Sequence, residues 1–246
     1  MKRLMVKQIT YLMGFIFSLF LVVDTSYAYL VSDENVQING VGIAGLVEFL
    51  ITNPDGKKLG YNLETQEYYK EFEGGYTNIM PEGESVFSGS EAGFNLIEGT
   101  YMIETIGAVK LTKFYMGIRI NSKDNYGGFE VEGVIDKGLT SKFEFVYSSD
   151  GLTPWSLTRV ATFSSLKQDI ELAHKVGWIK NKGIMQSLLK KAEAIEGSIE
   201  RDRSTRSAEN QLNALIKEIK AIKSKHIDDK AVTMLTEDVE YLLENL

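Results

Sequence analysis

The chain has 246 residues, no cysteine and a formal net charge of −7, from 34 acidic and 27 basic side chains. The absence of cysteine excludes disulfide bonds, cysteine-ligated zinc and a lipid-modified cysteine. The acidic balance argues against a nucleic-acid-binding protein, because contact with a phosphate backbone needs a basic surface that displaces counterions.

The N-terminal segment 1–28 has the parts of a secretory signal peptide. Three basic residues precede an apolar run over residues 9–23, and a short segment with small residues ends at Ala28. The run of about 15 residues is shorter than the roughly 20 that a membrane-spanning helix needs, which weighs against an uncleaved anchor. We therefore predict cleavage between Ala28 and Tyr29, and an exported mature protein without a membrane segment, located in the periplasm or outside the cell.

Charge and residue pattern divide the rest of the chain in two. Residues 29–163 carry 19 acidic and 10 basic side chains, whereas 164–246 carry 14 of each and have helical apolar spacing. The predicted fold class is a two-domain α+β protein, an antiparallel β-sandwich followed by a small all-α helical bundle. The predicted boundaries are a sandwich over 29–150, a linker over 151–163 and the bundle over 164–246.

Short strands with turns between them are predicted across the N-terminal domain. Apolar and polar residues alternate over 47–52, and the sequence NPDG at 53–56 supplies a turn. The same alternation recurs over 113–120 and 143–147. Several short alternating segments separated by turn residues are typical of an antiparallel sandwich.

Two segments of this domain resemble secreted bacterial modules. FLITNPDGKKLGYNLETQE and EGTYMIETIGAVKLTKFYMGIRI are similar to hairpins of immunoglobulin-like or prepeptidase-like β-sandwich modules, over about residues 34–148. Lys57 and Lys58 replace the arginines that are usual there, so a guanidinium fork is missing. The resemblance implies an accessory module and carries no common activity.

Helices with amphipathic spacing are predicted for the C-terminal domain. Gly177 is expected to end the first helix, and Asn181 and Asp228 are expected to cap later ones. Each helix has an apolar stripe that has to be buried against the others, which predicts a compact bundle.

The C-terminal domain also resembles a known family. The segments GWIKNKGIMQSLLKKAEAI, AENQLNALIKEI and KSKHIDDKAVTML are similar to the FIMAH domain, over about residues 163–246. The departures are Ser224 at a position usually held by glycine, and the longer charged turn RDRSTRS. The resemblance implies an appended accessory or interaction role.

Catalytic signatures are weak. Neither GxSxG nor HExxH occurs, and the two histidines, His174 and His226, lie in different helical segments. A glycosidase needs two carboxylates across a cleft, and glutamates are frequent between residues 64 and 91. Because they lie mostly in loop-like sequence, we interpret them as a solvated acidic rim, with a small hydrolase as an alternative. They are Glu64, Glu67, Glu71, Glu73, Glu82, Glu84 and Glu91.

Ligand contacts are predicted at tyrosines set among these acids, because exposed tyrosine rings stack on sugars or anchor protein partners. Filling of the sandwich core is the alternative role. The candidates are Tyr61, Tyr68, Tyr69 and Tyr76. No metal or other cofactor is required, but weak calcium candidates are Asn53, Asp55 and Asp124, whose oxygens suit a hard cation and equally suit tight turns.

Taken together, these patterns predict a secreted, non-enzymatic accessory protein for binding or scaffolding at the cell exterior. The expected partner is a cell-surface polysaccharide or another extracellular protein. The alternatives are a carbohydrate- or calcium-binding module and a small secreted hydrolase that uses paired glutamates.

Overall fold

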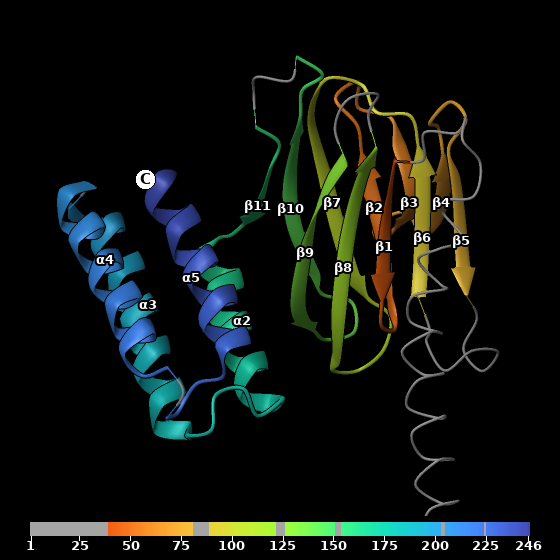
Figure 1. The fold of residues 1–246 in the computed structure, drawn as a ribbon. Helices are drawn as coiled ribbons and strands as arrows, with labels where there is room; N and C mark the ends of the chain where they lie inside the picture. The colour runs from red at the N-terminus through yellow and green to blue at the C-terminus, as the bar shows by residue number, and fades with distance from the viewer. Residues whose placement is uncertain (1–38, 81–88, 122–125, 151–153, 203–204, 224) are drawn as a thin grey trace, which may run out of the picture. The chain divides into compact units, whose positions relative to one another are not determined.

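The computed structural model describes residues 39–246, apart from 81–88, 122–125, 151–153, 203–204 and 224. Strands occupy the N-terminal part and helices the C-terminal part (Figure 1), so the predicted two-domain α+β fold class is confirmed. The predicted signal peptide and its cleavage site at Ala28 and Tyr29 lie outside the described residues. No helix in the described ranges is long and apolar enough to cross a membrane.

Two antiparallel sheets form the β-sandwich (Figure 1). In spatial order, the five-stranded sheet contains β5 (Tyr76–Met80), β6 (Gly89–Phe94), β1 (Asn39–Ala44), β8 (Thr112–Asn121) and β9 (Tyr126–Ile135). The six-stranded sheet contains β11 (Ser156–Val160), β10 (Thr140–Tyr147), β7 (Gly99–Gly107), β2 (Val47–Thr52), β3 (Lys58–Asn62) and β4 (Glu67–Lys70). The predicted strands over 47–52, 113–120 and 143–147 are therefore confirmed.

The sandwich core follows from the alternation of apolar residues along the strands. Ile51 of β2, Met116 of β8 and Phe143 of β10 are at most 1 % exposed and belong to one hydrophobic cluster drawn from both sheets. Aromatic rings fill part of it, with 5.7 Å between the ring centroids of Tyr101 and Phe145. This burial is the main stabilising contribution to a sandwich that has no disulfide.

Four helices follow the strands. They are α2 (Phe163–Lys175), α3 (Lys182–Asp202), α4 (Thr205–Ala221) and α5 (Asp229–Glu244). The predicted helix stop is confirmed, since α2 ends at Lys175 and Gly177 has a φ of +82°. Asn181 Oδ1 accepts the backbone N–H of Gly183 at 2.7 Å, which satisfies a donor at the start of α3 as predicted.

Side-chain caps also fix the starts of α2 and α5. Thr162 and Ser165 form a capping box at the start of α2, in which each side chain accepts the backbone N–H of the other residue. Asp228 caps α5, as predicted, by accepting the backbone N–H of Lys230 at 3.0 Å. These caps set where each helix starts and therefore which residues face its neighbours.

A strand lies inside the segment 151–163 that the sequence predicts to be a linker. Residues Ser156–Val160 form β11, which pairs antiparallel with β10 at the edge of the six-stranded sheet. This segment has weak alternation and follows turn-type residues, but the exposed edge of β10 supplies partners for its backbone groups. Only Ala161 and Thr162 separate β11 from α2.

Strand residues contribute to the hydrophobic core of the helices. Val134 of β9 and Ala161 belong to the same buried cluster as the helical apolar stripes, and Leu139 packs against both this cluster and the sandwich core. The described residues from Asn39 to Leu246 form one compact unit. The short connection after β11 therefore joins two parts that share a packed boundary.

Candidate functional site

The β3–β4 hairpin brings two of the predicted tyrosines together. Tyr61 and Tyr68 are paired across the two strands, with 5.1 Å between their ring centroids. Tyr68 is 57 % exposed, and its hydroxyl donates to Glu48 Oε1 at 2.9 Å. Partial desolvation, together with the Glu48 carboxylate, raises the pKa of Tyr68 to about 12, so the phenol stays neutral. We call this pair the aromatic ledge, which lies on β3 and β4 at one edge of the six-stranded sheet as the described residues form it.

The other two predicted tyrosines have different surroundings. Tyr69 is half-buried, and the Nζ of Lys58 lies 5.5 Å from the centroid of its ring. Tyr76 belongs to β5 in the other sheet, where its ring lies over Gly93, so that a Cβ there would be 2.3 Å from Tyr76 Cε1. The structure therefore does not gather all four tyrosines into one surface.

Several glutamates of the acidic segment are solvated. Glu64, Glu67 and Glu73 are exposed, and Glu71 Oε2 accepts the backbone N–H of Lys58 at 2.7 Å. Glu91 lies on β6, in the other sheet. Two more of the predicted acids, Glu82 and Glu84, lie outside the described residues. The contacts of Glu71 show a structural use of its carboxylate, as an acceptor that holds β4 beside β3.

The calcium candidates in the β2–β3 turn are engaged in local bonds. Asn53 Oδ1 accepts the backbone N–H groups of Asp55 and Lys57, at 3.1 and 2.9 Å, as in an Asx turn. Asp55 is exposed, and Asp124 lies outside the described residues. Within the described ranges, no group of three or more histidine or acidic side chains could hold a metal ion.

A buried charged cluster lies where β11 meets the helices. Arg159 of β11 donates through Nη2 to Asp169 Oδ2 of α2 at 2.6 Å, and through Nε to Asp238 Oδ1 of α5 at 2.7 Å. All three side chains are at most 3 % exposed. The guanidinium carbon also lies over the ring of Phe143, 5.3 Å from its centroid. We call Arg159, Asp169 and Asp238 the buried triad.

Burial has the largest single effect on the pKa values of Asp238 and Arg159 in the triad. Desolvation raises the pKa of Asp238 to about 8, against the opposing attraction of Arg159, and the neighbouring Asp169 adds to the rise. Desolvation alone lowers the pKa of Arg159, but the two carboxylates more than offset it and hold this pKa above its usual value. Arg159 Nη1 and Asp238 Oδ2 have no hydrogen-bond partner within the described part of the protein.

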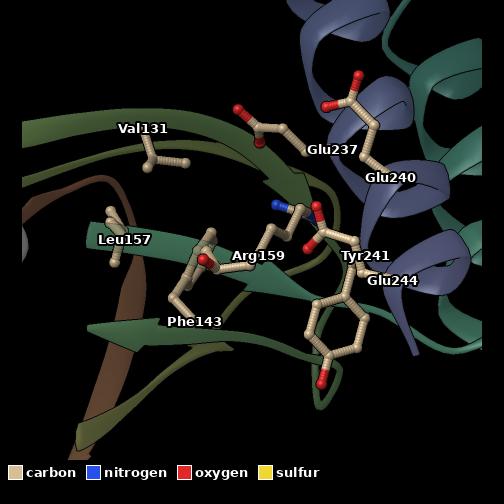
Figure 2. Close-up of a pocket in the computed structure, with 9 residues that line it drawn as sticks. Val131, Phe143, Leu157, Arg159, Glu237, Glu240, Tyr241 and Glu244 are labelled. Atoms are coloured by element: carbon tan, nitrogen blue, oxygen red, sulfur yellow. The ribbon is translucent and has the colours of Figure 1, made fainter. Parts of the chain in front are cut away.

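A cavity of about 210 Å³ opens beside the triad (Figure 2). Apolar side chains from the strands and polar side chains from α5 line it, with Arg159 between them (Figure 2). The lining residues are Val131, Phe143, Leu157, Thr158, Arg159, Glu237, Glu240, Tyr241 and Glu244. We call this the α5 pocket.

The glutamates of the α5 pocket are not equivalent. Glu237 is half-buried, and desolvation raises its pKa, while Arg159 opposes the rise and Glu240 adds to it. Glu240 is exposed and pairs with Lys220 of α4 at 3.4 Å. Glu244, one turn further along α5, is exposed. Hydrogen-bond acceptors therefore line the helical side of the pocket, opposite Val131, Phe143 and Leu157.

A second cavity, of about 190 Å³, is also lined by Arg159. Its lining includes the hydroxyl groups of Thr140 and Ser141 and the amide group of Gln168. Thr162 and Ser165 also line it, but their hydroxyl groups already form the capping box of α2. This cavity therefore has fewer uncommitted groups than the α5 pocket.

The sequence predictions missed the triad, although a signal for it was present. Leu166, Asp169, Ile170 and Ala173 have the spacing i, i+3, i+4, i+7 of a buried helical stripe. In α5, Leu235, Asp238, Val239 and Leu242 repeat that spacing. A carboxylate at the same stripe position in two helices indicates a buried cation between them. The sequence does not indicate Arg159 as the cation, because it lies in the segment 151–163 that is predicted to be a linker.

Comparison with protein families identifies the helical part. Residues 163–244, about a third of the chain, match the FIMAH domain. Helices α2 to α5 make up this matched segment, and we call it the FIMAH domain. The resemblance predicted over 163–246 is thus confirmed, and the match begins at the first residue of α2. Comparisons with curated proteins and with solved structures gave no match.

Proposed function

We propose that the protein is exported and acts without catalysis, by binding or scaffolding at the cell exterior. The buried triad is the observation that carries this proposal, because it fixes the FIMAH domain to the edge strand of the sandwich. A buried arginine bonded to two helices holds their orientation relative to β11. The sandwich and the FIMAH domain then present their surfaces as one body, which suits a scaffold.

The sandwich takes the role of an immunoglobulin-like or prepeptidase-like accessory module in this proposal. Its two antiparallel sheets and the tight β2–β3 turn agree with the hairpin resemblance. The signal-peptide pattern of residues 1–28 supports export. A β-rich chain without cysteine has to remain folded outside the cell through core packing alone, and the shared hydrophobic boundary contributes to that.

The first binding surface in this proposal is the aromatic ledge of Tyr61 and Tyr68. An exposed tyrosine ring provides contact area at a small entropic cost and can stack on a sugar or a protein side chain. Tyr68 of the ledge lies on β4, which is an edge strand of the six-stranded sheet within the described residues. The partner is a cell-surface polysaccharide or another extracellular protein.

Retention of the mature protein, residues 29–246, on insoluble cell-wall polysaccharide, with and without calcium, tests this proposal. Crosslinking on the producing cells covers a protein partner in the same experiment. Tyr68→Ala should weaken retention about tenfold if the ledge is a central contact, whereas Lys70→Ala on the same strand should leave it unchanged. The absence of both polysaccharide retention and cell-surface crosslinks would contradict a binding role.

A further inference from the structure

The α5 pocket has the composition of a binding site for a polar ring. Val131, Phe143 and Leu157 from three strands provide an apolar wall, and α5 places Glu237 and Tyr241 opposite it (Figure 2). Ligand sites commonly combine an apolar lining with a few convergent polar groups. The volume of about 210 Å³ is below the roughly 300–1,000 Å³ of pockets for drug-sized molecules, so the α5 pocket admits one ring and not a chain.

Arg159 provides a second, independent observation that points to a ligand. Its side chain is 3 % exposed and lines the pocket, yet its Nη1 has no acceptor within the described residues. The ring of Phe143 lies over the guanidinium carbon and therefore does not accept the N–H bonds, which lie in the guanidinium plane. A buried donor without a partner is costly, so an acceptor supplied by a ligand would be favourable.

These groups select among possible occupants. The glutamate oxygens accept hydrogen bonds, and Arg159 Nη1 donates one, so the occupant has to carry both donors and acceptors. A simple cation would pair with the glutamates but would leave Arg159 Nη1 unpaired and bring a second positive charge towards the guanidinium. A hydroxyl-rich ring meets both requirements and can lay its apolar C–H face against Val131 and Leu157.

We propose that the α5 pocket binds a single pyranose unit of a neutral or N-acetylated polysaccharide at the cell surface. This proposal rests on the proposed binding role and deepens it, since it names the ligand class and a second surface. Glu237 accepts hydrogen bonds from ring hydroxyls, Arg159 donates one to a hydroxyl or acetyl oxygen, and Tyr241 lines the pocket beside them. The α5 pocket borders β11, whereas the aromatic ledge lies on β4, at the opposite edge of the same sheet. Binding at the two surfaces can therefore be separated by mutation.

Titration calorimetry on the mature protein tests the pocket directly. The probes are cellotetraose, chitotetraose and a tetralysine peptide. We expect binding of at least one tetrasaccharide and none of the peptide. Glu237→Gln, which keeps the shape of the side chain, and Val131→Phe, which fills the cavity, should each raise the Kd about tenfold or more. Glu209→Gln on α4 is the charge-matched control, and thermal melting verifies that every variant is folded.

Each other result overturns the pocket assignment in a distinct way. If Tyr68→Ala abolishes saccharide binding while the two pocket variants bind normally, the α5 pocket is not the site, although the binding role stands. If only tetralysine binds and Glu237→Gln weakens it, the pocket recognises a cationic protein partner instead. If no tetrasaccharide binds while a cell-surface protein is crosslinked, the saccharide proposal fails and the exterior binding role survives. If nothing binds, both proposals fail.

Discussion

Arg159 Nε lies 2.7 Å from Asp238 Oδ1, although 79 positions separate the two residues in the sequence. This bond joins an edge strand of the sandwich to the last helix of the FIMAH domain. Asp169, ten positions after Arg159, completes the triad from α2. One buried guanidinium therefore joins two helices to the edge strand of the sandwich.

Removal of Arg159 should destabilise the protein strongly. Arg159→Leu leaves two buried carboxyl groups without a partner, which we expect to lower the free energy of unfolding by about 3–5 kcal/mol. Urea denaturation measures the change. Lys220→Ala breaks the exposed pair with Glu240 and should cost only about 0–1 kcal/mol. A similar loss in both variants would show that the triad contributes little. Replacing all three triad residues by leucine should recover much of the loss, because no unpaired charge remains.

Stability should depend on pH in a direction set by Asp238. Its pKa of about 8 in the folded protein lies above the roughly 3.9 of an unfolded aspartate, so the folded state binds the proton more tightly. Between about pH 4 and pH 8 the unfolded chain has lost this proton and the folded protein keeps it. The contribution is therefore fully present below about pH 4 and is lost as the pH rises through about 8.

Urea denaturation of the wild type and of Asp238→Asn at several pH values isolates the contribution of Asp238 to the free energy of unfolding. Asparagine cannot ionise, so the advantage of the wild type over the variant should shrink from pH 4 to pH 8. The raised pKa of Glu237 acts in the same direction, and the lowered pKa values of Asp136 and Glu130 act in the opposite one. Because the wild type and Asp238→Asn both contain Glu237, Asp136 and Glu130, the contributions of these three groups cancel when the two proteins are compared. A difference that grows with pH would contradict the assignment.

Regular patterns explain how much of the fold could be predicted from the sequence. The alternation of Phe49 and Ile51 and the glycine stop at Gly177 each involve only a few neighbouring residues, and the structure confirms both predictions. Strand β11 has weak alternation of its own, and it is defined by its backbone pairing with β10, the strand that precedes it in the chain. Alternation and turn residues therefore identify strands with a strong pattern of their own, and miss a strand whose pattern is weak and whose existence depends on pairing with its neighbour.

The candidate sites also differ in how far the sequence predicts them. The residue type and the short sequence separation of Tyr61 and Tyr68 predict a shared surface, and the β3–β4 hairpin does place their rings in contact. Tyr76 follows only a few residues later, but the chain has by then crossed to the other sheet. The α5 pocket draws its lining from three strands and one helix, so no single segment carries its signature.

The β2–β3 turn should depend on Asn53 and not on calcium. Asn53→Ala removes the acceptor of two backbone N–H groups, and we expect the free energy of unfolding to fall by about 1 kcal/mol. Asp55→Ala, at an exposed position, should stay within about 0.5 kcal/mol of the wild type. Calcium and a chelator should give the same Tm. A rise in Tm with calcium that Asp55→Ala abolishes would instead support a metal site in the turn.

The sandwich and the FIMAH domain should unfold together, because Val134 of β9 is fully buried in the hydrophobic cluster of the helices. Scanning calorimetry of the mature protein should show one transition, with equal calorimetric and van't Hoff enthalpies. Val134→Ala leaves a cavity at the shared boundary and should cost about 2 kcal/mol while lowering that single transition as a whole. Val146→Ala, at a half-buried position of β10, is the control and should cost less. Two separate transitions, of which Val134→Ala lowers only one, would mean that the domains fold independently and that the triad is not enough to couple them.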